Sequence, residues 1–301
     1  MKETSPRVLV VGVSGFLGGY LAESLRAFRW AVTGTYHSQP RPDGVKLDIR
    51  RPAELDRLCS EYSPDVVCLC AAEPNVDYCE QHPAETAAVN VEGTRNTALA
   101  ASRIGARVVF FSSDYVFDGT SGPYQEPDPV APLSEYGRQK VRSERLLQEL
   151  VPDCLILRVT VLYGWESQGK NFFEHLLRTV SRGQTLRVPN DQIGSPTLVN
   201  NLAEIAAQLV TQGARGLYHI AGPDRMDRYS FALQVANVFE LDASKIVGVP
   251  TSELKQAARR PLCAGIRADR VRKEISVKLV GVSEGLQWLK THPGVSPQPR
   301  G

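Results

Sequence analysis

The sequence of 301 residues lacks an excess of charge of either sign. Lysine and arginine together number 35 and the acidic residues number 33, which leaves a formal net charge of +2. Proteins that bind nucleic acid by neutralising its phosphate backbone carry a larger positive excess. We therefore expect no nucleic-acid partner.

Long hydrophobic runs are absent as well. The segment Met1–Arg7 is short and polar, and only a few apolar residues follow it before Gly12, so it does not read as a secretory leader. No run approaches the roughly 20 apolar residues that span a bilayer. These absences predict a soluble, cytoplasmic protein with no membrane partner.

The cysteines follow no metal-binding or disulfide pattern. Their spacings match none of the zinc motifs, and a chain of this length does not need a disulfide framework. We expect no metal site, and we expect all six to be small buried side chains, namely Cys59, Cys68, Cys70, Cys79, Cys154 and Cys263.

The first 160 residues alternate short β-branched runs with longer amphipathic stretches. Strands are predicted at Val8–Val11, Ala31–Thr35, Val45–Leu47, Val66–Ala71, Val108–Ser112 and Leu155–Thr160. Helices are predicted at Phe16–Ala27, Pro52–Glu61, Pro83–Ile104 and Ser134–Leu150. This alternation is typical of an α/β fold in which crossover helices join parallel strands. Residues 1–160 are thus expected to form a doubly wound Rossmann domain.

The chain changes character after Thr160. Four more helices, separated by loops rich in Gly, Pro and Asp, are predicted at Asn171–Arg182, Val199–Thr211, Ser230–Phe239 and Ser283–Thr291. We expect residues 161–291 to form mainly a smaller α+β substrate domain. A strand-like run near 217–221 interrupts it, and there the chain is expected to return to the main sheet. Residues 292–301 contain three prolines and two glycines and are expected to form a disordered tail.

A glycine-rich turn follows the first predicted strand. Gly12, Gly15 and Gly18 have the spacing GxxGxxG, between the run VLVV and an apolar helix. Glycine lets the backbone turn tightly and approach a pyrophosphate, whose charge is stabilised by the amides at the helix N-terminus. Because the flanking strand and helix supply the required context, the turn predicts a dinucleotide site.

The end of the second predicted strand indicates which dinucleotide is bound. An enzyme specific for NAD has an acidic residue there, about 20 residues after the glycines, that binds the ribose 2′-hydroxyl. This chain has the neutral stretch Thr35–Gln39, which includes His37 and Ser38, with Arg41 just beyond. The absence of a carboxylate favours NADPH, with NADH as the alternative.

A second constellation combines Tyr136, Lys140 and Ser113. Tyr136 and Lys140 lie four residues apart on a predicted helix, so they share one helical face. A neighbouring ammonium group favours the phenolate and would bring the pKa of the tyrosine toward neutrality. Ser113 closes a predicted strand and could donate a hydrogen bond to a substrate carbonyl. Together with the glycine turn, these three residues predict an active site for carbonyl reduction.

These residues resemble the extended short-chain dehydrogenase/reductases. Within them the chain is similar to the dTDP-4-dehydrorhamnose reductase family, to which the regulatory β subunit of methionine adenosyltransferase is closely related. The resemblance covers nearly the whole chain and rests on VLVVGVSGFLGGYL, CAAEPNVDYCE, AAVNVEGT, FFSSDYVFDG, PYQEPDPVAPLSEYGRQK, RVTVLYG, NDQIGSPT and GLYHIAG. SSDYVFDG and NDQIGSPT are the most specific of these segments.

The resemblance implies site residues position by position. Tyr136 and Lys140 match the catalytic pair and also bind the cofactor, and Ser113 stands where the family usually has threonine. The other implied cofactor residues are Gly12, Ser14, Gly15, Phe16, Leu17, Gly18, Asp48, Ile49, Ala71, Ala72 and Asn90. His37 and Ser38, at the end of the second predicted strand, are also expected to contact the cofactor. The implied substrate residues are Val76, Asp114, Tyr115 and Gln192.

Two departures concern the substrate. Val161 stands where relatives often have tryptophan, which removes an aromatic surface that could stack on a planar base. The segment Lys255–Lys273 contains seven basic residues, Arg260 among them. It predicts either a clamp for a diphosphate, with Arg260 as a substrate residue, or a solvated helix face.

The glycine turn and the catalytic residues predict an NAD(P)H-dependent oxidoreductase. The resemblance implies that its substrate is a 4-keto sugar nucleotide, and it leaves a homodimer open as the assembly. It also permits two alternatives: a regulatory subunit that binds NADP without catalysis, or a sugar-nucleotide epimerase or dehydratase.

Overall fold

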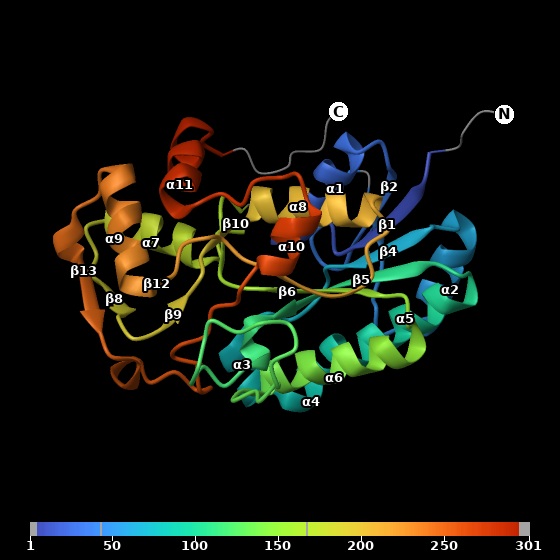
Figure 1. Ribbon diagram of the computed structural model, residues 1–301, viewed down its shortest axis with the longest axis horizontal. Helices are drawn as coiled ribbons and strands as arrows, with labels where there is room; N and C mark the ends of the chain where they lie inside the picture. The colour runs from blue at the N-terminus through green and yellow to red at the C-terminus, as the bar shows by residue number, and fades with distance from the viewer. Residues whose placement is uncertain (1–4, 43, 167, 295–301) are drawn as a thin grey trace.

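The computed structural model describes residues 5–42, 44–166 and 168–294 (Figure 1). At its centre is a seven-stranded parallel sheet with the order β11-β6-β5-β4-β1-β2-β3. The strands are β1 (Arg7–Val11), β2 (Ala31–Tyr36), β3 (Gly44–Lys46), β4 (Val66–Leu69), β5 (Arg107–Ser113), β6 (Leu155–Val159) and β11 (Gly216–Ile220). The expected doubly wound α/β fold is confirmed. The strand order reverses between β1 and β4, the point at which such sheets bind ligands.

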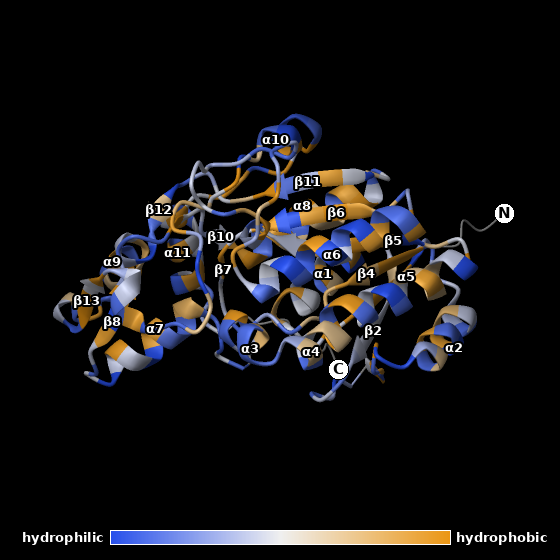
Figure 2. Ribbon diagram, turned by 90° about the horizontal axis from the view of Figure 1, so that it is seen from below, coloured by the Kyte–Doolittle hydropathy of each residue, from blue (hydrophilic) through white to orange (hydrophobic). Residues whose placement is uncertain are grey.

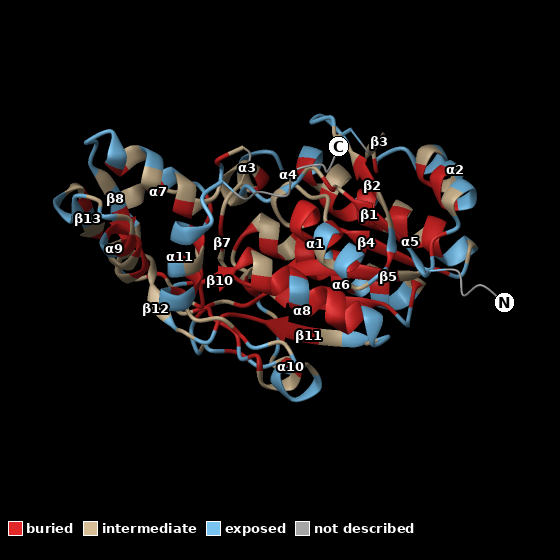
Figure 3. Ribbon diagram, turned by 90° about the horizontal axis from the view of Figure 1, so that it is seen from above, coloured by how far each residue is buried: buried red, intermediate tan, exposed pale blue. Residues whose placement is uncertain are grey.

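Helices cover both faces of this sheet. One face carries α1 (Phe16–Ala27), α8 (Val199–Thr211) and α10 (Asp269–Glu274), and the other carries α2 (Pro52–Tyr62), α5 (Gly93–Arg103) and α6 (Glu135–Leu150). Strands covered on both faces need nearly continuous apolar sequences, and the central strands are orange in Figure 2 and buried in Figure 3. The runs VLVV and VVCL satisfy this need.

Helix α6 begins and ends where the sequence predicts. The Ser134 hydroxyl accepts a hydrogen bond from the amide of Gly137 at 3.3 Å, which caps the helix. The helix ends at Leu150, before Val151 and Pro152. Tyr136 and Lys140 therefore lie in the first two turns of a well-defined helix.

The helix predicted at 83–104 is wrong as a single element. It divides into α4 (Pro83–Ala87), a π-helical turn η1 (Ala88–Glu92) and α5, and the preceding residues form a helix that was not predicted, α3 (Val76–Gln81). The carbonyl of Asn90 in the π turn accepts hydrogen bonds from the hydroxyls of Thr94 and Ser143, at 2.7 and 2.8 Å. The contact with Ser143 of α6 is tertiary, so the pattern of this segment alone does not reveal the widened turn.

A second lobe packs around its own apolar cluster. It contains α7 (Phe172–Ser181), α9 (Arg228–Phe239), α11 (Val282–Thr291) and a parallel strand pair that was not predicted, β8 (Leu186–Pro189) with β13 (Ile246–Val249). Two short pairs connect this lobe to the sheet domain: β7 (Leu162–Tyr163) with β10 (Thr197–Leu198), and β9 (Ile193–Gly194) with β12 (Met226–Asp227). The run at 217–220 forms β11, which pairs with β6 in the main sheet.

Other expectations have mixed outcomes. All six cysteines are free thiols, but only four are buried, because Cys70 and Cys263 are half-buried. Most of the predicted tail, 295–301, lies outside the described residues, and its first residue, His292, stacks on Trp288 with ring centroids 4.4 Å apart. No helix in the described ranges has both the length and the apolarity needed to cross a membrane. Within the same ranges there is no cluster of three or more potential metal ligands.

One ion pair is enclosed between α6 and the sheet. Arg158 of β6 donates to both oxygens of Glu144 at 2.9 and 2.7 Å, and the Ser112 hydroxyl donates to the same carboxylate at 2.5 Å. The two charged side chains are 6% and 7% exposed. A charge left alone in such a place is strongly disfavoured, so each partner depends on the other.

We predict that Glu144→Gln lowers the free energy of unfolding by about 3–5 kcal/mol, because it leaves the Arg158 charge buried without a counterion. Urea denaturation measures the change. The exposed pair Arg215–Asp153 is the control, and Arg215→Gln should cost about 0–1 kcal/mol. A loss for Glu144→Gln no larger than that of the control would contradict the prediction.

Candidate active site

The glycine turn has the geometry that a bound pyrophosphate requires. Gly12 has a φ of +94°, and a Cβ atom there would lie 2.8 Å from the amide nitrogen of Ala71. A Cβ at Gly18 would lie 2.2 Å from the carbonyl oxygen of Gly12. Gly15 is the N-cap of α1 and supplies no side-chain cap, so no side chain occupies the first amides of the helix. The turn therefore fits a phosphate-bearing dinucleotide.

The residues predicted to bind the adenosine of the cofactor lie beyond β2 and β3. His37 and Ser38 are exposed, and the His37 ring lies 3.8 Å from the carboxylate of Asp48. Arg50 donates two hydrogen bonds to that carboxylate, at 2.9 and 2.7 Å, and lowers the pKa of Asp48 to about 2. The carboxylate beside the His37 turn is therefore already paired. Ile49, next in the chain, packs under Gly93 at the start of α5.

Asn90 supports the wall of the groove after β4. Its side chain accepts a hydrogen bond from the amide of Glu73 at 2.8 Å and donates to the carbonyl of Glu73 at 3.1 Å. It also donates to Gln139 of α6 at 2.8 Å. Asn90 thus ties the loop that holds Ala71 and Ala72 to the helix that carries Tyr136.

The structure brings Ser113, Tyr136 and Lys140 together at the carboxyl end of β5. The Tyr136 ring packs edge-on against Tyr115 with centroids 6.0 Å apart, and Ser113 lies close enough to the Tyr136 phenol to lower the pKa of that group. The Lys140 ammonium lies 5.7 Å from the centroid of the Tyr136 ring and donates to the carbonyl of Phe111 at 2.8 Å. The three side chains therefore form one cluster, in which Ser113 and Lys140 are buried and Tyr136 is half-buried.

Burial controls the protonation of this cluster. It raises the pKa of Tyr136 well above its ordinary value, and the nearby Ser113 hydroxyl opposes the rise only in part. It also lowers the pKa of Lys140 to about 8, although the Glu144 carboxylate favours the charged form. The expected lowering of the tyrosine pKa by Lys140 is not among the effects found here, because burial dominates. The phenol stays protonated at neutral pH and can donate a proton.

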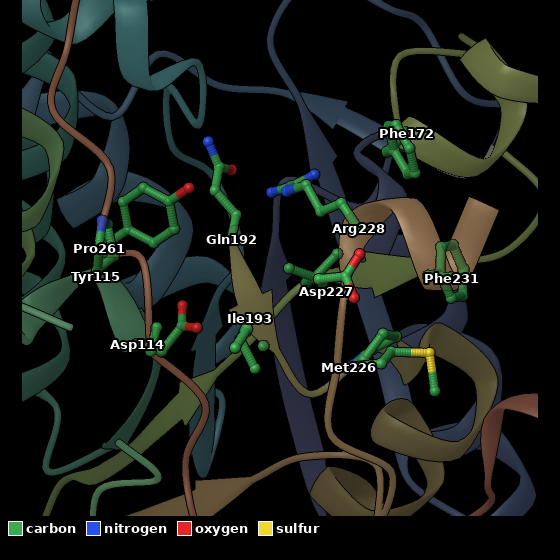
Figure 4. Close-up of a pocket in the computed structure, with 14 residues that line it drawn as sticks. Asp114, Tyr115, Phe172, Gln192, Ile193, Met226, Asp227, Arg228, Phe231 and Pro261 are labelled. Atoms are coloured by element: carbon green, nitrogen blue, oxygen red, sulfur yellow. The ribbon is translucent and has the colours of Figure 1, made fainter. Parts of the chain in front are cut away.

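A cleft of about 430 Å³, open to solvent, adjoins this cluster between the two lobes (Figure 4). The sheet domain contributes Asp114 and Tyr115, which directly follow Ser113. The second lobe and the strands that connect it contribute Phe172, Gln192, Ile193, Met226, Asp227, Arg228 and Phe231, and the chain near the C-terminus adds Pro261 and Ala264. Asp114 is buried, which raises its pKa, while hydrogen bonds from Thr160 and Ser113 at 2.7 and 3.2 Å oppose the rise.

The predicted substrate residues divide into two groups. Asp114, Tyr115 and Gln192 line the cleft, whereas Val76 and Arg260 are not among its lining residues. Arg260 instead forms an ion pair with Asp77 at 2.9 Å. The basic segment around Arg260 is not a helix face either, because its only α-helix is the short α10.

Sequence reasoning missed the residues that the second lobe contributes. Phe172, Met226, Arg228 and Phe231 belong to no recognised motif, and only tertiary packing brings them opposite Asp114. One signal was available, because an aspartate shortly before a predicted helix is a typical N-cap. Asp227 is the N-cap of α9, which places Arg228 at the first helical position rather than before the helix predicted from Ser230.

A protein-family model, described as the RmlD substrate binding domain, matches residues 6–291. The chain belongs to this family. The resemblance inferred from the motifs is confirmed, and the family model covers both lobes, from β1 to the end of α11.

Curated relatives of this family member include both enzymes and a regulatory subunit. A probable low-salt glycan biosynthesis reductase, Agl14, of Haloferax volcanii is 33% identical, with 93% of this chain and 96% of the relative covered. The dTDP-4-dehydrorhamnose reductase of Burkholderia thailandensis is 32% identical, with 91% and 94% covered. The methionine adenosyltransferase 2 subunit beta of Xenopus laevis is also 32% identical, with 85% and 79% covered.

A solved structure agrees with the fold of this family member. The dTDP-4-dehydrorhamnose reductase of Bacillus anthracis, solved in complex with NADP, superposes with a TM-score of 0.88 at 28% identity. The match covers 96% of this chain and all of that chain.

We predict that Gly18→Ala abolishes measurable NADPH binding, because its Cβ would collide with the backbone at Gly12 and displace the turn. Fluorescence titration with NADPH measures the effect. Gly183→Ala is the control: it adds the same methyl group outside the turn, at a φ of +71°, where a Cβ meets nothing within 4 Å. The interpretation fails if Gly18→Ala binds NADPH as the control does.

Proposed function

We propose that this chain is an NADPH-dependent reductase of a 4-keto sugar nucleotide, similar to dTDP-4-dehydrorhamnose reductase. The observation that carries the proposal is the cluster of Ser113, Tyr136 and Lys140 beside the cleft. Curated reductases at 32–33% identity, and the NADP complex of the Bacillus anthracis enzyme, support it.

Different residues of the chain have different roles in the proposed reaction. The turn from Gly12 to Gly18 and the amides at the start of α1 would hold the pyrophosphate of NADPH. NADPH, when bound, supplies the hydride for carbonyl reduction. Tyr136, protonated at neutral pH, donates its proton to the carbonyl oxygen, and Ser113 orients that oxygen by a hydrogen bond. Lys140 places a positive charge beside the phenol and would bind the ribose of the nicotinamide.

The proposal also covers the location and the assembly of the protein. We propose that it acts in the cytoplasm on a small-molecule substrate and forms a homodimer, for which light scattering in solution is the direct test. The division into a cofactor domain, 1–160, and a mainly substrate-binding part, 161–291, stays a prediction. The second lobe with its own apolar cluster supports it.

A second candidate is a regulatory subunit that binds NADP and a partner enzyme. The observation that favours it is the 32% identity to the methionine adenosyltransferase 2 subunit beta over 264 residues. Stoichiometric capture of methionine adenosyltransferase by the purified chain, with no reduction of any keto sugar, would favour this candidate over the reductase.

We predict that Tyr136→Phe lowers kcat for dTDP-4-keto-6-deoxy sugar roughly 10²–10⁴-fold, because it removes the proton donor. NADPH oxidation followed by its absorbance gives the rate. NADPH affinity should change little, since the ring and its packing against Tyr115 remain. Unchanged turnover would refute the role of Tyr136.

We predict that kcat/KM falls as the pH rises through about 8, because the charged form of Lys140 is lost there while Tyr136 stays protonated. Lys140→Arg, which keeps its charge at every accessible pH, should move this falling limb to higher pH even if its maximum rate is lower. The assignment is wrong if the limb near pH 8 persists in Lys140→Arg.

A further inference from the structure

One cation that lines the cleft, Arg228, lacks a carboxylate partner. Its side chain forms no salt bridge and no hydrogen bond to any residue in the described parts of the chain. The adjacent carboxylate of Asp227 is occupied, because it accepts hydrogen bonds from the amide and the hydroxyl of Ser230 at 2.9 and 2.6 Å. An arginine charge in a half-buried position normally has an anionic partner, so the missing partner points to a ligand.

The backbone fixes where this side chain stands. β12 pairs with β9, which sets Asp227 opposite Ile193, and the amide of Arg228 donates to the carbonyl of Gln192 at 3.2 Å. Arg228 is also the first residue of α9, a helix of 12 residues. In Figure 4 its guanidinium points into the cavity, toward the side on which Gln192 and Tyr115 lie.

The surroundings of the guanidinium are mostly apolar. The Arg228 guanidinium lies 5.5 Å from the centroid of the Phe172 ring, and Ile193, Met226 and Phe231 line the same part of the cleft. An aromatic face holds the planar group without satisfying its hydrogen-bond donors. These donors remain available to a ligand in the cleft.

The cleft presents its charged groups on two sides. Asp114 lies on the side of the catalytic cluster, and Arg228 lies on the side of the second lobe, next to the Asp227 carboxylate that Ser230 holds. The two groups form no ion pair within 4 Å, yet the charge of Arg228 stabilises the Asp114 carboxylate. This arrangement favours the orientation in which the anionic end of a substrate faces Arg228 and its neutral end faces Asp114.

We propose that Arg228 binds the diphosphate of the substrate and directs its neutral keto sugar toward Asp114 and Tyr136. A guanidinium matches phosphate oxygens with paired hydrogen bonds, and a diphosphate offers several of them. This inference rests on the proposed function and assigns to one residue the recognition of the anionic part of the substrate. Arg260, which the sequence offered for this role as one of two alternatives, already has Asp77 as its counterion.

The test is a calorimetric titration of the full chain with dTDP and UDP, and with thymidine and uridine as probes that lack phosphate. Arg228→Gln should raise the Kd of a diphosphate that the wild type binds roughly 10- to 100-fold and leave nucleoside binding unchanged. Arg182→Gln, which removes an exposed charge from the same lobe, is the matched control and should change neither. Arg228→Lys, which keeps the charge but loses the paired hydrogen bonds, should give an intermediate Kd.

Several results would overturn the inference. These are an unchanged diphosphate Kd in Arg228→Gln, an equal loss in Arg182→Gln, an equal loss for the nucleosides, or no binding of either diphosphate to the wild type. NADPH affinity reports whether each variant is folded. If Arg228→Gln does not fold, the comparison of diphosphate with nucleoside in Arg228→Lys decides.

The same titration separates this inference from the proposed function. Binding is measured without turnover, so it does not depend on reductase activity. Diphosphate binding that depends on Arg228, in a chain that reduces no keto sugar, would refute the reductase and leave the anion site standing. If Arg228→Gln reduces the keto sugar and binds the diphosphate normally, the anion site is refuted and the reductase stands.

Discussion

The close approach of α6 to the end of β5 is the contact on which the active site depends. A Cβ atom at Gly137 would lie 2.2 Å from the carbonyl oxygen of Tyr115, so the helix can reach this position only with glycine there. The contact sets Tyr136 beside Ser113 and brings Lys140 to the carbonyl of Phe111. Without it, Ser113 on β5 and the pair Tyr136 and Lys140 on α6 would lie apart.

Burial then determines the chemistry that this contact allows. The same desolvation that keeps the Tyr136 phenol protonated weakens the charge of Lys140. Glu144, one helical turn after Lys140, opposes that weakening, and it is itself held by Arg158 and Ser112. The buried ion pair under α6 therefore contributes to the charge state of the site as well as to stability.

The cleft extends this cluster into a site whose two sides carry different charged groups. Its catalytic side carries the carboxylate of Asp114, and its far side carries the guanidinium of Arg228 among apolar side chains. Asp114 belongs to the segment SSDYVFDG, whereas Arg228 belongs to no recognised motif. The separation of unlike charges, rather than any single contact, gives a bound molecule its direction.

The sequence by itself determined the features that depend on near neighbours in the chain. The alternation of strands and helices predicted the doubly wound sheet, the glycine spacing predicted the turn, and Ser134 before the YxxxK stretch predicted the start of α6. These features follow from backbone hydrogen bonds, helical periodicity and the space that a side chain occupies. All three act over a few residues.

Only the tertiary structure decided which distant side chains meet. The π turn at Asn90 depends on Ser143 of another helix, the ion pair with Asp77 removes Arg260 from the cleft, and the pairing of β12 with β9 brings Arg228 into it. Each outcome joins residues far apart in the chain. Such contacts depend on how whole elements pack, and no local pattern in the sequence carries that information.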